Sequence, residues 1–196
     1  MASRKRLSRD DWVEAGFRAL MTHGPDAVAV EPLAAGLAVT KGSGYWHFTD
    51  RAALLTAVLD VWVQRLTVDV IARVEVNEGT PRDRMARLLA LVMEGVERSP
   101  TELLVTVSPD LLVRRAAERA LGLRLAYLQR LVEESGQKPA EARARAVLAY
   151  SAYLGHATLL ATAPTALPQG TAVRRRMRAA LLELAVPTAG PGATGR

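Results

Sequence analysis

Apolar side chains recur at helical spacing along most of the chain, and this pattern predicts a succession of α-helices. The first apolar run consists of Trp12, Val13, Phe17, Leu20 and Met21. Ser8 precedes this run and can cap a helix, and Gly24-Pro25 stops it. We therefore expect a first helix between Ser8 and Gly24.

Two short helices and one long helix are predicted next. A short apolar stretch around Leu33 marks a second helix, and Thr40 can cap a third. Asp50 can cap a long fourth helix, whose apolar stripe consists of Leu55, Val58, Leu59, Trp62 and Leu66. The polar turn cluster at 77–83 ends this fourth helix.

The rest of the chain is also typical of helices, separated by proline, glycine and serine breaks. These predicted helices cover residues 85–98, a shorter piece up to Ser108, and residues 110–135, 139–162 and 171–186. No sustained alternation of apolar and polar residues indicates a strand. We expect an all-α fold of about nine helices, followed by a disordered tail at 187–196.

The segment from residue 40 to residue 48 combines side chains that suit a surface of phosphates, sugars and base edges. It contains Thr40, Lys41, Ser43, Tyr45, Trp46 and His47. A cation gives affinity for phosphate, and hydroxyls and flat rings can contact bases and sugars. The segment offers no nucleophile–base pair of the kind that an enzyme pocket requires. Two short helices with this set on the second predict a helix-turn-helix whose second helix recognises DNA.

Composition and charge change this picture only in part. The chain has 196 residues, 49% of them hydrophobic, so it can bury a sizeable core. It has no cysteine, which fits a cytoplasmic protein, and no apolar run of about 18 residues that would span a membrane. The formal net charge is +6, but the first 60 residues hold seven basic and seven acidic side chains. Net charge alone therefore does not indicate that the first 60 residues bind DNA.

A local basic arm precedes the first predicted helix. Arg4, Lys5 and Arg6 can follow the DNA backbone or enter the minor groove, with Arg9 close behind them. The alternative is a solvated tail without a DNA contact. A second basic cluster at residues 174–178 is expected to face solvent or border a subunit interface rather than bind nucleic acid.

Together these features resemble the TetR-type family of bacterial transcriptional repressors, specifically over residues 8–62. The resemblance is carried by Gly24, Leu33-Ala34, Val39-Thr40-Lys41-Gly42, Tyr45-Trp46-His47-Phe48 and Leu54-Leu55. It implies a DNA-binding head at residues 1–49 and a helical ligand-binding and dimerisation body at residues 50–186. It also implies a homodimer that binds a near-palindromic double-stranded DNA operator, with heads about 34–36 Å apart.

The polar and aromatic side chains of the third predicted helix have expected roles in DNA contact. Lys41 is expected to contact phosphate, as are the Tyr45 hydroxyl and His47. Ser43 and Trp46 are expected to contact base edges or sugars, and Thr40 to cap the helix while touching phosphate. The alternatives are a solvated lysine at position 41 and an aromatic ring that packs on the first helix.

Three positions depart from the family's pattern. Val28 stands where a capping Ser or Thr is usual, and Ala38 replaces the usual turn glycine. Gly44 occupies the place of a bulky apolar residue that anchors the recognition helix to the core. We therefore expect either a poorly ordered recognition helix without DNA or a core in which Trp12 or Phe17 fills the space.

The predicted body offers two candidate sets of functional residues. A helical seam with a second copy of the chain could be formed by Leu148, Ala152, Gly155, Leu159, Ala180, Leu181 and Leu184. An apolar cavity with a few polar groups could be lined by Trp62, Met93, Tyr127, Gln129, Tyr150, Tyr153 and His156. For both sets, ordinary packing within one chain is the alternative.

The sequence therefore predicts a ligand-responsive DNA-binding transcriptional regulator, released from its operator by a largely apolar small molecule. We expect no enzyme and no cofactor, since no P-loop, dinucleotide-binding or zinc-protease motif occurs. Only three histidines are present, without ligand spacing, so no metal site is expected. The remaining alternative is a helical small-molecule-binding or protein-interaction dimer whose head binds DNA weakly or not at all.

Overall fold

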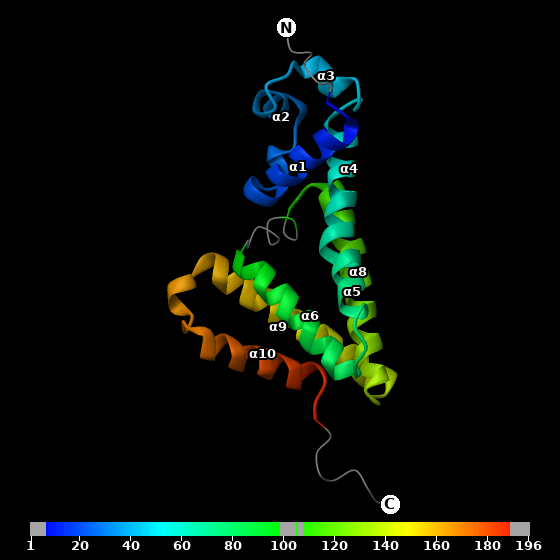
Figure 1. The fold of residues 1–196 in the computed structure, drawn as a ribbon, viewed down its shortest axis with the longest axis vertical. Helices are drawn as coiled ribbons and strands as arrows, with labels where there is room; N and C mark the ends of the chain where they lie inside the picture. The colour runs from blue at the N-terminus through cyan, green and yellow to red at the C-terminus, as the bar shows by residue number, and fades with distance from the viewer. Residues whose placement is uncertain (1–6, 99–104, 106–107, 189–196) are drawn as a thin grey trace, which may run out of the picture. The chain divides into compact units, whose positions relative to one another are not determined.

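A computed structural model describes residues 7–98, residue 105 and residues 108–188 (Figure 1). All regular secondary structure among these described residues is helical. These residues form two compact units. Unit 1 comprises the described residues up to Val68 and those of the range 101–120. Unit 2 comprises the described residues of the ranges 69–100 and 121–196. The predicted all-α fold is confirmed.

The first helix of unit 1, α1 (Arg9–His23), has the boundaries that its end signals predict. The Ser8 hydroxyl accepts a hydrogen bond from the Asp11 backbone N–H at 3.2 Å, and Asp11 accepts one from the Ser8 N–H at 2.7 Å. This reciprocal pair is a capping box, which satisfies two backbone donors at the helix start. Gly24 ends the helix with a φ of 85°, a conformation that favours glycine.

The helix-turn-helix consists of α2 (Val30–Gly36) and α3 (Lys41–Tyr45), joined by a turn through Ala38. Ala38 has a φ of 54°, the left-handed region that favours glycine. The next helix, α4 (Arg51–Val63), begins as predicted, because the Asp50 carboxylate accepts a hydrogen bond from the Ala53 N–H at 2.7 Å. Figure 1 labels these helices α1 to α4.

The core of unit 1 lies where α1 packs against α4. Trp12, Leu20, Leu54 and Leu55 are fully buried there. The two helices approach closely at Gly16, where an added Cβ would lie 2.5 Å from Val58 Cγ2. A larger residue at position 16 would therefore push α1 away from α4.

The predicted long fourth helix is interrupted, which corrects the expectation of one regular helix up to the turn cluster. After Val63 the backbone makes a π-helical turn, η2 (Gln64–Val68), and then continues as α5 (Asp69–Glu75). A π-turn inserts one residue into the helical ladder, and such turns are frequent at functional sites. Here it ends at Val68, the last residue of the first segment of unit 1.

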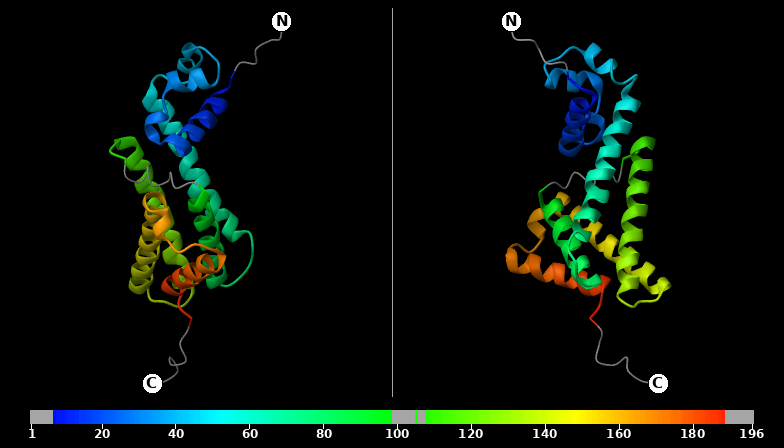
Figure 2. Two further views of the ribbon diagram at one scale, coloured as in Figure 1. Left: turned by 90° about the vertical axis from the view of Figure 1, so that its left-hand side faces the viewer. Right: turned by 45° about the vertical axis from the view of Figure 1, so that its right-hand side comes forward.

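Unit 2 is built from helices, and those after α5 have boundaries that agree with the sequence breaks. They are α5, α6 (Pro81–Arg98), the second part of α8 (Leu111–Glu134), α9 (Pro139–Thr162) and α10 (Thr171–Ala185), with a 3-10 turn η3 (Pro164–Ala166) before α10. Helix α10 packs against both α6 and α9, and α5 packs against α6 (Figure 2). Buried Met85, Leu131 and Ala142 belong to the core of this unit.

Parts of the predicted organisation lie outside the described residues. These are the basic arm at residues 4–6, most of the short piece before Ser108 and residues 189–196 of the tail. Over the part of the chain that is described, no helix is long and apolar enough to cross a membrane. The same residues contain no group of three or more His or acidic side chains arranged to hold a metal ion.

Candidate nucleic-acid interface

Most side chains of the predicted recognition helix lie on the surface of unit 1. Lys41 and Tyr45 are exposed, and Trp46 is 71% exposed although it is a large aromatic residue. Ser43 is half-buried. A ring with this exposed fraction does not belong to the core of unit 1. The alternative in which Trp46 packs on α1 is therefore wrong.

The recognition helix contacts the core through Gly44. This residue is buried, and a Cβ built on it would lie 2.7 Å from Trp12 Cη2 and 2.7 Å from Val30 Cγ1. The indole of Trp12 thus fills the space that a bulky residue at position 44 would need. Phe17 is only half-buried, with the Arg65 guanidinium 4.7 Å from its ring centroid. The prediction that Trp12 or Phe17 fills the space beside Gly44 is confirmed for Trp12.

Neither short helix has a side-chain cap. Thr40 occupies the position before α3, but its hydroxyl makes no capping hydrogen bond, so the expected capping role is wrong. The corresponding position of α2 is Ala29, also without a side-chain cap, while Val28 is fully buried in the core. The predicted lack of a side-chain cap on α2 is confirmed, but the capping position is Ala29 and not Val28. Exposed Thr40 is left with a hydroxyl that is not used for capping and can meet a phosphate oxygen.

The Tyr45 hydroxyl already has a partner on α2. It donates a hydrogen bond to Glu31 Oε1 at 2.8 Å. This bond raises the pKa of Tyr45, since the neutral hydroxyl is the form that donates to the carboxylate. The phosphate contact expected of Tyr45 stays a prediction, and it requires the hydroxyl to leave or share Glu31. Glu31 is a residue of this surface that the sequence pattern did not single out.

His47 lies against the residue that precedes α1. Its Nε2 is 3.0 Å from the Leu7 carbonyl oxygen, so Nε2 is the protonated nitrogen in this contact. Arg9 adds a second contact, with its guanidinium 5.1 Å from the Phe48 ring centroid. The root of the predicted basic arm is thereby held beside the end of α3. The phosphate contact expected of His47 stays a prediction, and only its other nitrogen is left for it.

The seven predicted ligand residues divide between the two units. Trp62 is buried in the core of unit 1, whereas the other six belong to unit 2. Polar atoms of three of these six bind neighbours: Tyr127 donates to Glu75 at 2.7 Å, Gln129 to Glu133 at 2.8 Å, and Tyr150 accepts from Arg124 at 3.1 Å. These hydroxyl and amide groups therefore already have hydrogen-bond partners within unit 2.

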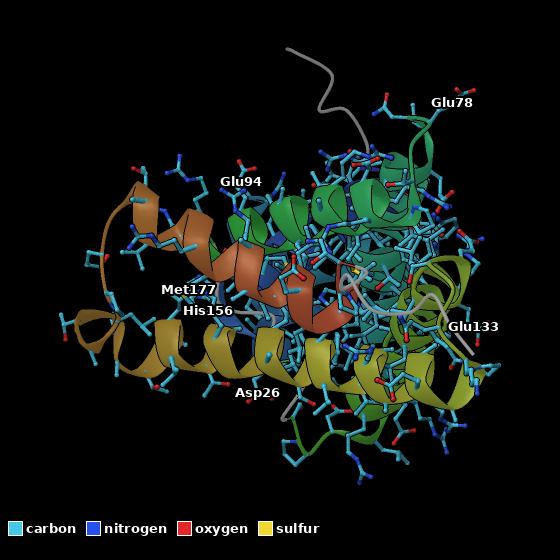
Figure 3. The ribbon with its side chains drawn as sticks, turned by 90° about the horizontal axis from the view of Figure 1, so that it is seen from below. Asp26, Glu78, Glu94, Glu133, His156 and Met177 are labelled. Carbon is cyan, nitrogen blue, oxygen red and sulfur yellow. The ribbon has the colours of Figure 1, made fainter. Side chains whose placement is uncertain are left out.

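His156 differs from these residues, because neither ring nitrogen has a hydrogen-bond partner although the residue is only 9% exposed. Met93 and Tyr153 are also buried. In Figure 3, His156 of α9 and Met177 of α10 lie between the two ribbons. Buried polar atoms are nearly always paired in folded proteins, so an unpaired buried imidazole is a candidate contact for a bound molecule.

The predicted dimer residues are partly exposed. Leu148 and Leu159 of α9 are 55% and 48% exposed, and an added Cβ at Gly155 between them would meet nothing within 4 Å. Ala180 is exposed, and Ala152 and Leu184 are half-buried against their own unit. Leu181 is only 9% exposed and packs in the core of unit 2, so its expected place in the seam is wrong.

The described residues of unit 1 thus form a helix-turn-helix whose second helix lies on the surface. Residues 13–58 match the model of the tetR family of bacterial regulatory proteins. This range contains α2, α3 and the tryptophan-bearing surface. The resemblance drawn from the sequence is therefore confirmed over these residues, which belong to unit 1. Among curated proteins, no sequence matches the chain.

Solved structures agree over nearly the whole chain. A TetR transcriptional regulator from Legionella pneumophila has a TM-score of 0.72 and 13% identity, covering 95% of this chain and 100% of its own. FadR, a fatty acid degradation regulator from Bacillus halodurans, has a TM-score of 0.68 and 14% identity, covering 99% and 100%. FadR from Bacillus subtilis in complex with stearoyl-CoA has a TM-score of 0.70 and 14% identity, covering 91% and 98%. These likenesses show that the described residues have the fold of TetR-type transcriptional regulators.

Proposed function

We propose that this chain is a homodimeric transcriptional repressor that a small-molecule effector releases from a near-palindromic operator. The observation that carries the DNA-binding part is the exposure of Lys41 at the start of α3 and of Trp46 at its end, where Trp46 is 71% exposed. A cation near a helix start and a flat exposed ring match phosphate and base-edge contacts in the major groove. Thr40 and Ser43 add hydroxyls to the same short helix.

Dimerisation follows from the small size of this recognition surface. One helix of five residues contacts few bases, so useful specificity requires two heads on successive major-groove faces. The α9 face with Leu148, Gly155 and Leu159 is apolar, exposed and open to close approach of another helix. A second copy that covers this face would bury both leucines and bring two helix-turn-helix motifs into one particle.

Effector binding is assigned to unit 2. The unpaired, buried imidazole of His156 supports this assignment, together with buried Tyr153 and Met93. A largely apolar molecule with one polar group near His156 would satisfy such a site. One structural neighbour is FadR in complex with stearoyl-CoA, so a long-chain acyl-CoA is a reasonable first probe. Coupling of about 1–3 kcal/mol between effector and DNA would weaken DNA binding about 5- to 150-fold.

Titration of the purified protein into fluorescent duplexes from the region upstream of its own gene tests the proposal. We expect a sequence-selective complex whose affinity falls steeply with salt, because phosphate contacts release counterions. Lys41→Ala should weaken all duplexes alike and reduce the salt slope by about 1. Trp46→Ala should alter sequence preference. Lys138→Ala, at the exposed residue just before α9, serves as a matched control. Equal affinity for all duplexes at every salt concentration would contradict the proposal.

The effector part has its own experiment with the same complex. Stearoyl-CoA, stearate and free coenzyme A are added separately to the preformed protein–DNA complex. Release by the acyl compounds but not by coenzyme A would support an apolar effector, and release by coenzyme A alone would contradict it. If none of the three releases DNA or binds the protein, long-chain acyl compounds are ruled out as effectors while the DNA-binding result stands.

A further inference from the structure

The exposed face of the helix-turn-helix carries one feature that affinity for phosphate does not explain. Glu31, in the first turn of α2, is an exposed acidic residue, and its Oε1 accepts the hydrogen bond from the Tyr45 hydroxyl at 2.8 Å. Tyr45 is itself 44% exposed, so this pair lies on the surface rather than in the core. The bond links α2 to α3 across the exposed side of the motif.

Glu31 carries its negative charge at neutral pH. Its pKa lies below the ordinary value of 4.5, first because the Tyr45 hydroxyl donates to the carboxylate and then because of its own backbone N–H and the Lys41 charge. The surface thus places a fixed anion among the groups that the proposed function assigns to DNA contact.

An anion on this surface opposes DNA binding unless it meets a hydrogen-bond donor on the DNA. Phosphate oxygens are acceptors and repel a carboxylate. In the major groove the donors are the N4 amine of cytosine and the N6 amine of adenine. Adenine presents its N7 acceptor beside that amine, which disfavours a carboxylate, so cytosine is the base that matches Glu31.

We propose that Glu31 is a specificity-determining residue that accepts a hydrogen bond from the N4 amine of a cytosine in each half-site. Tyr45 is a positioning residue in this arrangement, since its hydroxyl holds one carboxylate oxygen and leaves the other for the base. This inference rests on the proposed DNA-binding function and adds a residue of α2 to base recognition. In this arrangement the anion lowers affinity for wrong sequences more than for the right one, because only the right one offers it a hydrogen-bond donor.

Selection of duplexes from a randomised library, followed by affinity measurements, tests the assignment. The proteins compared are the unchanged chain, Glu31→Gln, Tyr45→Phe and Asp26→Asn. Asp26 is an exposed acid of the turn before α2, so Asp26→Asn removes the same charge from another position. Circular dichroism confirms that each variant is folded before selection.

The unchanged chain should select a cytosine at one position of each half-site. Glu31→Gln should lose about tenfold discrimination at that position, the scale of one mismatched base pair, while binding random DNA more tightly. Tyr45→Phe should keep the cytosine preference with weaker discrimination, and Asp26→Asn should keep it in full. A Glu31→Gln variant that still selects the same sequence with the same discrimination would overturn the role of Glu31 alone. If no protein in the set selects any sequence, the proposed DNA-binding function fails and this inference fails with it.

Discussion

Trp12 and Gly44 form a complementary pair in the head of this protein: the indole of α1 occupies the space above the glycine of α3. An added Cβ at position 44 would lie 2.7 Å from Trp12 Cη2 and 2.9 Å from Trp12 Cζ3, both shorter than real Cβ contacts. Trp12 is fully buried. A large residue on the first helix thus compensates for the missing one on the recognition helix, and the total core volume is kept.

Gly44→Ala should destabilise the protein, although alanine favours a helix more than glycine does. Helix propensity would contribute up to about 1 kcal/mol in favour of alanine. Overpacking against rigid Trp12 and Val30 should cost about 1–3 kcal/mol, so the net free energy of unfolding should fall. Gly42→Ala on the same helix is the control, because its Cβ would approach nothing closer than Thr40 Oγ1 at 3.9 Å. Urea unfolding that ranks Gly44→Ala as the more stable variant would contradict the paired packing.

Ala38→Gly should stabilise the head, which is the opposite of the usual effect of glycine. Ala38 has a φ of 54°, and an L-residue with a Cβ pays about 1–2 kcal/mol in this left-handed region. Removing the Cβ should recover about 1 kcal/mol, less the added freedom of the unfolded chain. Ala35→Gly within α2 should instead destabilise by about 1 kcal/mol. The two variants are compared by thermal and urea unfolding, and shifts of the same sign would contradict the strain at Ala38.

These two positions show how far the sequence alone could lead. Gly44 and Ala38 stood out as departures from the family's pattern, because a missing side chain and a missing glycine are visible in a sequence. Which residue would fill the space at Gly44 depended on the angle between α1 and α3, and a sequence does not contain this angle. The hydrogen bond of Glu31 with Tyr45 joins residues 14 positions apart in sequence. It depends on how α2 and α3 are arranged, which a sequence does not contain either, so Glu31 was not predicted.

For the body, the sequence predicts where the helices begin and end but not which helices pack against each other. Helix boundaries followed from prolines, glycines and caps, which act locally. The insertion of a π-turn after Val63 has no sequence signature, since a single extra residue leaves the apolar pattern almost unchanged. Leu148 and Leu181 are both leucines on predicted helices, yet one is exposed and the other buried. Burial depends on which helices pack together, and periodicity identifies an apolar face without naming its partner.

Glu75 should make the stability of unit 2 depend on pH in acid. The pKa of its carboxyl is lowered first by the hydrogen bond from the Tyr127 hydroxyl and then by the Arg130 and Arg84 charges. A carboxyl whose pKa is lower in the folded state stabilises the fold above its ordinary pKa of 4.5 and loses this contribution as pH falls through the folded value. The side chain is 34% exposed, so solvent screening limits the contribution to about 1 kcal/mol.

Glu75→Gln should therefore reduce the free energy of unfolding by about 1 kcal/mol at pH 7 and flatten its dependence on pH below about 5. Denaturant unfolding between about pH 3 and about pH 7 measures both effects. Exposed Glu78→Gln removes an equal charge nearby and should leave the pH dependence as it is. A variant at position 75 with an unchanged pH profile would show that this network does not stabilise the unit.

Leu148→Arg should weaken dimerisation, whereas Val147→Arg should not. Both side chains are exposed, at 55% and 44%, but adjacent residues point about 100° apart on a helix. Only Leu148 shares a face with Gly155 and Leu159, since these lie two and three turns further along α9. A charge buried in an apolar seam should raise the dimer dissociation constant by about tenfold or more. Sedimentation equilibrium measures this constant, and equal effects of the two variants would contradict the α9 seam.

His156→Phe should separate effector binding from DNA binding. The imidazole is buried with both nitrogens unpaired, so replacing it by an apolar ring of similar size removes an unsatisfied polar group. We therefore expect the variant to be as stable as the unchanged protein or up to about 1 kcal/mol more stable. Its DNA affinity should be unchanged, because His156 lies in unit 2 and α3 in unit 1.

The difference should appear only when effector is added. If His156 holds the polar group of the effector, the loss of one buried hydrogen bond should weaken binding of an active compound about tenfold. Release of DNA should then require a correspondingly higher concentration of that compound. Calorimetric titration gives the affinity and fluorescence anisotropy the release. Lys138→Ala at the other end of α9 should alter neither measurement. A His156→Phe protein that binds and responds like the unchanged chain would place the effector elsewhere in unit 2, among side chains whose polar atoms already have partners.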